Sequence, residues 1–274
     1  MAEQYAAHQH VQAVGRVVRA EAEALAAEWR GWDDAAWEAP SACAGWAVKD
    51  VAAHVTEGAA RAIPVIAAAL EGAPTPQFSA EERAERTREV RALPGAELAV
   101  RFPRDVDAAF ALLEGATEAA LGTTVVVPAG THTLAELATQ RLVEAALHAW
   151  DCRAPRDPAA GLRPEAAALV VDYVMARAAR LATGEAARTL SATYHCALEG
   201  PSGGPVTLTL ADGQASATRG APAAADAVVS LPVEAFVRLL WGRLDLPRAL
   251  AAGTVRAEGD AAKARALGDV FRGR

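Results

Sequence analysis

Aromatic residues make up only 5% of this 274-residue chain, although 52% of its residues are hydrophobic. Much of the hydrophobic fraction is alanine, and a chain rich in alanine but poor in large rings favours packed helices over a sandwich of strands. The length exceeds that of an average domain, so we expect one large domain or two modest ones with adequate cores. Helix is expected to dominate the fold.

Cysteine is scarce as well. The chain has three cysteines, an odd number, and they are widely spaced without a CxxC pair: Cys43, Cys152 and Cys196. This pattern argues against a disulfide framework and against a zinc ribbon. The chain also lacks a P-loop and a G-x-G-x-x-G turn, so the sequence does not support nucleotide use.

Basic charge does not predominate, because 27 Lys and Arg residues face 34 Asp and Glu residues and give a formal net charge of −7. No lysine-rich stripe stands out, so we expect no nucleic-acid partner. The sequence has no run of 18 uncharged apolar residues, and its first residues lack a charged segment followed by an apolar one. We therefore expect no membrane partner and a cytoplasmic location.

The first 160 residues read mainly as helix. Apolar positions recur at helical spacing, and Ser79 followed by Glu82 forms a capping box that predicts a helix start. A break is expected at Leu93-Pro94-Gly95, and the TTVVVP segment predicts a short extended run. The expected helices span residues about 4–30, about 47–72, 79–93, 106–120 and 134–152.

Beyond residue 160 the pattern changes. Pro164 is well placed as the first residue of a linking helix that stops near Gly184. From Thr189 onward, short alternating runs separated by Gly, Asp and Pro predict an antiparallel sheet, and helical segments follow. The expected architecture is α+β, with a helical bundle in residues 1–160 and a linking helix plus a small α+β domain in residues 161–274.

The segment VEAALHAWD carries the most chemical information. It places Glu144 and His148 four residues apart, so on a helix the two side chains lie on one face. A carboxylate and an imidazole in this arrangement can share a divalent metal, and His54, in DVAAHVTEG, can supply a third ligand. Three protein ligands leave a coordination position open for chemistry.

Each of these residues also has a plainer interpretation. An E-x-x-x-H pair is commonly a solvated ion pair, but Glu144 and His148 lie among apolar neighbours, where buried charge needs a partner. We interpret Cys152, one turn beyond His148, as a core residue rather than a fourth ligand. Asp151 has two open interpretations, orientation of a ligand or a salt bridge at the helix end.

Cys43, in the PSACAGW loop, has no adjacent base or cation in the sequence, so we assign it to loop packing rather than to catalysis. The remaining histidines show no convincing ligand spacing and are interpreted as structural or surface residues: His8, His10, His132 and His195.

Two N-terminal segments, WEAPSACAGWAVKDVAAHV and LVEAALHAWD, resemble the mycothiol-dependent maleylpyruvate isomerase family, which belongs to the DinB-like metal-binding four-helix bundles. The C-terminal pattern DAVVSLPVEAFVRLLWGRLDLPRALAAGTVRAEGDAAKARAL is similar to the companion domain of that family, which resembles sterol carrier proteins. Together these segments span nearly the whole chain. The resemblance implies a DinB-like bundle followed by a sterol-carrier-like α+β domain.

The resemblance also implies a site. In the family a divalent metal, usually zinc, is held by a histidine of the second helix and by an E-x-x-x-H pair, which match His54, Glu144 and His148 here. Mycothiol is the family's thiol cofactor. An arginine of the C-terminal domain helps at the active site, and Arg243, in WGRL, is our candidate for a residue that holds a substrate carboxylate.

The expected function is therefore a metal-dependent enzyme that uses mycothiol on a small electrophilic metabolite. A thiol that loses its proton at the metal can add to an activated double bond, which permits rotation about what is now a single bond, and then leave again. In a transfer reaction the thiol stays attached. One alternative is a non-catalytic carrier that binds a metal or a lipid, favoured by the apolar segment 236–244. A weaker alternative is a metal-dependent hydrolase in which hydroxide takes the place of the thiolate.

Overall fold

The computed structural model describes residues 6–272, and the chain divides into two compact units, residues 1–160 and 161–274. The architecture is α+β, as expected: the first unit is mainly helical, and the second combines helices with a five-stranded sheet. Residues 4 and 5, at the start of the first expected helix, lie outside the described residues. Within the described part of the chain, no helix is both long and apolar enough to cross a membrane.

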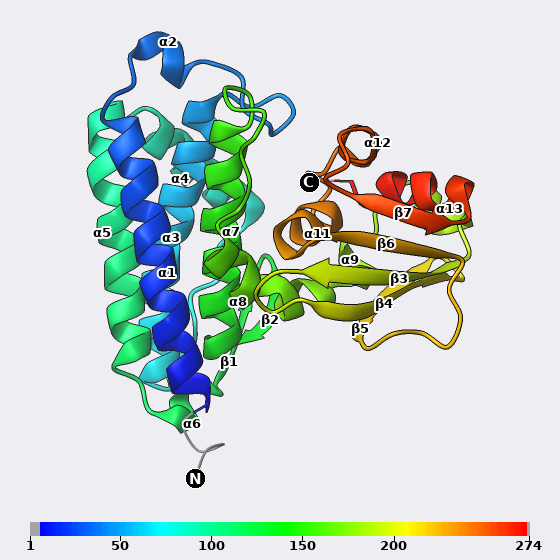
Figure 1. The fold of residues 1–274 in the computed structure, drawn as a ribbon. Helices are drawn as coiled ribbons and strands as arrows, with labels where there is room; N and C mark the ends of the chain where they lie inside the picture. Colours follow the sequence, from blue (N-terminus) through cyan, green and yellow to red (C-terminus); the bar gives the residue numbers. More distant parts are fainter. Residues whose placement is uncertain (1–5, 273–274) are drawn as a thin grey trace. The chain divides into compact units, whose positions relative to one another are not determined.

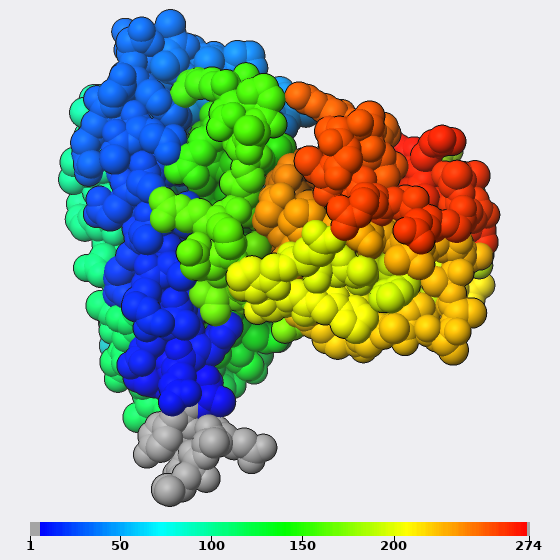
Figure 2. All heavy atoms as spheres, viewed as in Figure 1, coloured from blue at the N-terminus to red at the C-terminus, as the bar shows by residue number. Residues whose placement is uncertain are grey.

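Four long helices form the bundle of the first unit (Figure 1). They are α1 (Ala6–Trp29), α3 (Val48–Leu70), α5 (Gly95–Glu114) and α7 (Leu134–Arg153). α1 packs against α5 and α7, and α3 packs against the same two helices. Figure 2 shows α1, in blue, and α7, in green, side by side on one face of the unit.

α3 and α7 run in opposite directions. His54 of α3 contacts Glu144 of α7, whereas Gly58, one turn later on α3, faces Arg141, one turn earlier on α7. This arrangement places the polar face of α7 against α3 along two successive turns. It is the part of the fold that positions the candidate site.

The apolar stripe that predicts the first helix forms its buried face. Six apolar residues recur at helical spacing between positions 11 and 25. Val17 is half-buried, and the other five are buried: Val11, Val14, Val18, Ala22 and Leu25. Burial of such side chains contributes about 25 cal/mol per Å² of apolar surface to the free energy of folding, and this is the main term that stabilises a helical bundle.

Shorter elements connect the bundle helices. They are α2 (Asp34–Trp37), α4 (Ala80–Arg91), α6 (Glu118–Leu121), β1 (Thr124–Val127) and β2 (Gly130–Thr133). The capping box predicted at Ser79 is present, because its Oγ accepts from the Glu82 N–H at 3.1 Å and its own N–H donates to the Glu82 carboxylate at 2.6 Å. The extended run expected at TTVVVP is β1, which pairs with β2 in an antiparallel hairpin.

The helix expected at 106–120 differs from the one observed. α5 begins at Gly95 and ends at Glu114, and α6 is a separate turn. Pro94 occupies the N-cap position, where a missing N–H costs nothing, so the proline and glycine mark a helix start rather than a break. A Cβ on Gly95 would lie 2.3 Å from the indole of Trp37, so this glycine permits the close approach of α2 to α5.

The second unit begins with α8 (Pro164–Met175), which has the predicted proline at its first residue. It stops well before Gly184, where the linking helix was expected to end. Gly184 instead donates to the Val270 carbonyl at 2.8 Å, and a Cβ on Gly184 would lie 1.9 Å from the Asp269 carbonyl oxygen. This glycine therefore serves a close backbone contact and not a helix C-terminus.

The sheet of the second unit has the order β5-β4-β3-β6-β7. Its strands are β3 (Ala192–Glu199), β4 (Gly204–Ala211), β5 (Gln214–Arg219), β6 (Ala227–Pro232) and β7 (Arg256–Gly259). β3 and β6 pair in parallel, which corrects the expectation of a wholly antiparallel sheet. Residues 220–226 carry the chain from β5, at one edge of the sheet, across to the far side of β3. After this crossover, β6 runs in the same direction as β3.

Helices complete this unit. They are α9 (Ala178–Leu181), α10 (Ala186–Thr189), α11 (Val233–Leu240), α12 (Leu246–Ala251), α13 (Ala261–Ala266) and a final 3-10 turn at Leu267–Asp269. α8 packs on α11, and α13 packs on β6 and β7. The buried side chains of β3 alternate along the strand, as expected for a sheet with one face in the core.

Candidate metal centre

Three side chains from α3 and α7 converge on one point of the first unit. The Nε2 atom of His54 lies 3.2 Å from Oε2 of Glu144, and Nε2 of His148 lies 3.5 Å from the same oxygen. The two imidazole rings meet edge to face with centroids 4.9 Å apart. The structure thus brings together the three residues that the sequence predicts as ligands.

The other oxygen of Glu144 is held from one turn earlier on α7. Gln140 donates from Nε2 to Glu144 Oε1 at 3.0 Å, and its own Oε1 accepts from Arg141 Nε at 2.7 Å. Because Gln140 occupies Oε1, the carboxylate presents Oε2 to the two imidazoles. The i,i+4 spacing of Gln140 and Glu144 is the sequence signal for this contact.

His148 is oriented from its other side by Asp151. The Nδ1 N–H of His148 donates to Asp151 Oδ2 at 2.8 Å, and the Asp151 side chain is fully buried. A proton fixed on Nδ1 leaves Nε2 as the atom that faces Glu144. Of the two interpretations left open for Asp151, the structure therefore shows orientation of His148.

The pKa values of the pair reflect these contacts. Burial raises the pKa of Glu144, but hydrogen bonds from His148 and His54 outweigh burial and hold it well below its usual range. Burial lowers the pKa of His148, but hydrogen bonds to Asp151, Cys43 and Glu144 raise it well above its usual range. Both shifts have the direction expected when a carboxylate and an imidazole stabilise each other's charged form.

The donor set fits a divalent metal. One ligand atom from each of the three residues lies within 4.8 Å of the others. Metal bonds of about 2.1 Å at tetrahedral angles separate neighbouring ligand atoms by roughly 3.4 Å, and the two distances to Glu144 Oε2 are close to that value. Two imidazoles and one carboxylate are ligands that Zn²⁺ and related cations accept.

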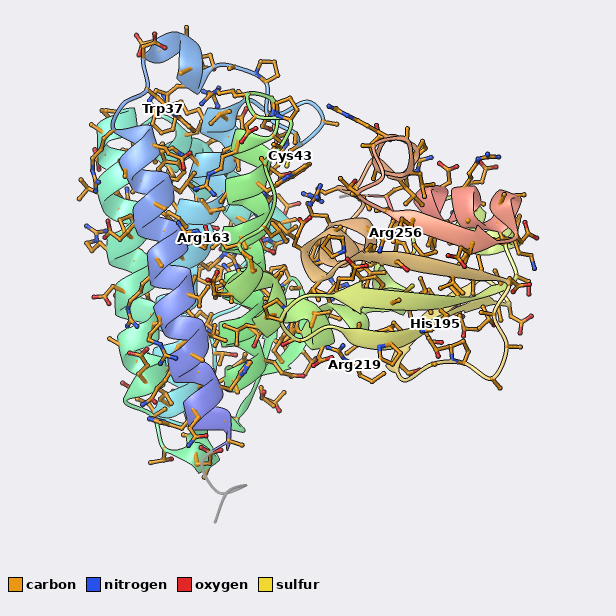
Figure 3. The ribbon with its side chains drawn as sticks, viewed as in Figure 1. Trp37, Cys43, Arg163, His195, Arg219 and Arg256 are labelled. Atoms are coloured by element: carbon orange, nitrogen blue, oxygen red, sulfur yellow. The ribbon has the colours of Figure 1, made fainter. Side chains whose placement is uncertain are left out.

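Cys43 lies closer to this centre than the sequence suggests, and Figure 3 shows it on the loop before α3, beside the upper end of α7. Its Sγ donates to Asp151 Oδ2 at 3.1 Å and lies 4.0 Å from His148 Nδ1, so the fold supplies a neighbouring carboxylate and imidazole that the sequence around Cys43 lacks. The loop before α3 folds back onto the end of α7, where the Ala42 N–H donates to the Asp151 carbonyl at 2.9 Å. No sequence spacing connects this loop to a helix about one hundred residues later.

Cys43, His148 and Asp151 form a second group with metal-ligand spacing, which shares His148 with the first. Cys152 belongs to neither group among residues 6–272, and burial raises the pKa of its thiol, as expected for a core residue. Trp46 borders the first group with its ring centroid 5.4 Å from that of His54.

The remaining histidines lie elsewhere. His132 is buried in the hairpin with Nδ1 2.9 Å from the Gly130 carbonyl, and His10 Nε2 lies 2.7 Å from Thr139 Oγ1. His195 lies on β3 of the second unit. Within the described part of the chain, neither these three nor His8 belongs to a group with metal-ligand spacing.

Arg243 belongs to the second unit and follows α11. Its Nη1 donates to the Trp241 carbonyl at 3.0 Å. Its role at the metal centre stays a prediction.

A hollow of about 110 Å³ opens beside Glu144 and His54. α3, α7 and the β1–β2 hairpin form its walls, and two arginines line it, Arg61 and Arg141. Neither arginine stands out from the sequence as a site residue. Arg61 lies seven residues after His54, which places it on the same helical face two turns away, and Arg141 lies three residues before Glu144.

The comparisons with known proteins concern both units. Residues 18–153 match the family described as the mycothiol maleylpyruvate isomerase N-terminal domain, and residues 174–272 match the SCP-2 sterol transfer family. The fold is similar to solved structures of a mycothiol-dependent maleylpyruvate isomerase and of its histidine-to-alanine mutant. Each has 20% identity and a TM-score of 0.62, over 85% of this chain and 90% of that chain. No curated protein matches the chain significantly.

Proposed function

Residues 18–153 belong to the mycothiol maleylpyruvate isomerase N-terminal domain family and residues 174–272 to the SCP-2 sterol transfer family, and from this premise we propose a metal-dependent enzyme that uses mycothiol. Its reaction is cis–trans isomerisation of, or S-transfer to, a small electrophilic metabolite. The proposed metal ligands are His54, Glu144 and His148.

One observation supports the proposal most strongly. The Nε2 atoms of His54 and His148 meet one oxygen of Glu144, while Gln140 holds the other oxygen and Asp151 holds Nδ1 of His148. Ligand side chains that are themselves hydrogen-bonded keep their orientation, which is a property of metal sites. A simple ion pair needs none of these supporting contacts.

A divalent cation held by His54, Glu144 and His148 would supply positive charge that lowers the pKa of a thiol beside it. The mycothiol thiolate would add to an activated double bond, forming a C–S bond and an enolate; after rotation about the new single bond, the C–S bond would break and the double bond would form again. In a transfer, the enolate would instead take up the proton that the thiol had lost, and the C–S bond would remain. Two neutral imidazoles and one carboxylate leave a divalent ion with a net charge of about +1, so the ligand set preserves this effect.

The surrounding side chains have separate tasks in this proposal. Asp151 keeps the proton of His148 on Nδ1, so Nε2 stays available as a ligand atom. Gln140 prevents Glu144 from turning its second oxygen toward the imidazoles. Trp46 shields one side of His54 from water, because its ring lies in edge contact with the imidazole.

Metal analysis of the purified full-length protein tests the ligand assignment. We expect elemental mass spectrometry to find about one equivalent of divalent metal per chain, since the three ligands form one site. His148→Ala removes one ligand and should abolish both metal retention and mycothiol-dependent activity. His195→Ala, on β3 of the second unit, is the matched control and should retain both. Full metal occupancy in His148→Ala would refute the assignment.

A reaction run without mycothiol separates the enzyme from a metal-dependent hydrolase. We expect no turnover of an electrophilic substrate in the absence of the thiol. Turnover at the same rate without mycothiol would favour the hydrolase, whose nucleophile is a metal-activated water.

The match of residues 174–272 to the SCP-2 sterol transfer family favours a second candidate, a lipid carrier. Solvent extraction of the purified protein followed by mass spectrometry distinguishes the two functions. A carrier releases lipid in proportion to protein, and the proposed enzyme releases none.

A further inference from the structure

The hollow beside the metal centre has an unusual distribution of charge. Its walls are largely apolar, with Val65 of α3, Leu137 of α7 and Val127 of the hairpin among the lining residues. Two guanidinium groups, those of Arg61 and Arg141, line the same small space. The one carboxylate in the lining is Glu144, both of whose oxygens already accept from Gln140 or contact the two imidazoles.

Arg61 is held in place by a buried ion pair. Its Nε lies 3.1 Å from both oxygens of Glu57, one turn earlier on α3, and Glu57 is only 4% exposed. Arg86 of α4 approaches the same carboxylate at 3.3 Å. Two cations therefore share one anion, and this trio keeps a net positive charge beside the hollow.

Arg141 is held in place by two features of the helices around it. Its Nε donates to Gln140, and its Nη1 lies 2.8 Å from the position that a Cβ on Gly58 would take. The guanidinium therefore rests against the backbone of α3 where a side chain is missing. A guanidinium keeps its charge at any ordinary pH, so Arg141 contributes a fixed positive charge next to Glu144.

A second hollow, of about 230 Å³, adjoins the first and shares Arg61, Val65, Val127 and Pro128 with it. Arg61 thus lies at the boundary between the two spaces. A ligand with one end at Glu144 has apolar walls along its length and the guanidinium groups of Arg61 and Arg141 beside it. This arrangement suits a molecule whose middle is apolar and which carries a negatively charged group that the two arginines can hold.

We propose that Arg61 and Arg141 form a subsite for an anionic group, carboxylate or phosphate, of the electrophile. The anion binds between the two guanidinium groups, and the rest of the molecule extends toward His54 and Glu144. The planar fork of an arginine matches either anion with paired hydrogen bonds. This inference rests on the proposed function in one respect, which is that the ligand is named as the electrophile. The two arginines lie together in the first unit whatever the reaction is.

Binding of crotonate and crotonamide to the purified full-length protein tests the subsite. The two probes have nearly the same shape and differ in charge, and inorganic phosphate serves as a third probe. We expect crotonate or phosphate to bind about tenfold more tightly than crotonamide in ligand-detected NMR titrations, because charge-assisted hydrogen bonds are the stronger ones. The stronger of the two anions identifies the group that the subsite takes.

Arg61→Gln and Arg141→Gln should each reduce the preference for the anion to about twofold or less, because one guanidinium of the pair is lost. Arg88→Gln is the control, since Arg88 is 70% exposed on α4 and pairs with Glu85. It should leave the preference unchanged. A melting curve of each variant establishes that it is folded, and Arg61→Lys and Arg141→Lys, which keep the charge, should restore part of the preference.

His148→Ala separates this subsite from the metal. The preference for the anion should persist in His148→Ala, because the arginines and not the metal hold the anion. Loss of the preference in His148→Ala, or equal affinity for crotonate, phosphate and crotonamide in the natural protein, would overturn the subsite. If the natural protein, purified and analysed for metal, retained no metal but still preferred the anion, the proposed enzyme function would be overturned and the anion subsite would stand.

Discussion

At the scale of single residues, the site consists of three side chains and the hydrogen bonds that hold them. His54, Glu144 and His148 follow from the sequence, because the i,i+4 spacing and the apolar surroundings identify them. Gln140 follows from the same helical spacing. Cys43 does not, because its contact with Asp151 depends on how one loop folds back onto α7. Local periodicity carries no information about such long-range contacts.

Asp151→Asn tests the hydrogen bond that orients His148. The amide oxygen can still accept from Nδ1, but the negative charge behind the imidazole is lost. We expect zinc affinity to fall by about 10-fold to 100-fold, the usual effect of removing such a partner. Competition with a zinc-chelating dye measures the change.

Asp157→Asn is the matched control for this measurement. Asp157 lies on an exposed turn after α7, where its Oδ1 accepts from the Ala159 N–H at 2.9 Å. Zinc affinity should be unchanged in this variant. Equal affinity in Asp151→Asn and in the natural protein would show that Asp151 has no role in holding the ligand.

At the scale of elements, the sequence predicts the helices that carry the site but not every boundary. α3 and α7 are observed close to the expected ranges, because both have long apolar stripes, and α7 has a capping box at Thr133 and Glu136. The start of α5 was missed by eleven residues, because a Pro-Gly pair reads as a break when its tertiary partner is unknown. The partner is Trp37, whose indole occupies the space beside Gly95.

Gly95→Ala tests that explanation. Its new Cβ would meet the Trp37 indole at 2.3 Å, so the ring must move out of a buried position. We expect the free energy of unfolding to fall by about 1–3 kcal/mol, the usual cost of overpacking. Urea denaturation followed by tryptophan fluorescence measures the loss.

Gly31→Ala belongs to the same unit and serves as the comparison. Its Cβ would lie 3.5 Å from the Glu28 carbonyl oxygen, an ordinary contact, so a change within about 0.5 kcal/mol is expected. If the two variants were equally stable, the close approach of Trp37 would not be what requires glycine at position 95.

At the scale of the whole molecule, the sequence predicts an α+β architecture, and the structure confirms it. The sheet order is a different matter, because alternation of apolar residues shows which face of a strand is buried but not which strands are neighbours. The parallel pairing of β3 with β6 depends on the path of residues 220–226, which contain no periodic signal.

The two units also differ in which proposed site residues they contain. Every residue of the proposed metal centre and of the proposed anion subsite lies in residues 1–160. The second unit contributes Arg243 as a predicted catalytic residue and a match to a family of sterol transfer proteins. Its part in the reaction therefore stays a prediction, whereas the metal centre has a defined geometry to test.

X-ray absorption at the zinc edge of the zinc-loaded protein tests the proposed ligand set of His54, Glu144 and His148, because the spectrum distinguishes nitrogen and oxygen ligands from sulfur. These ligands predict a shell of nitrogen and oxygen at about 2.0–2.1 Å without mycothiol, and one sulfur at about 2.3 Å once mycothiol is added. A sulfur ligand before mycothiol is added would place the metal at Cys43, His148 and Asp151 instead, and would refute the proposed ligand set.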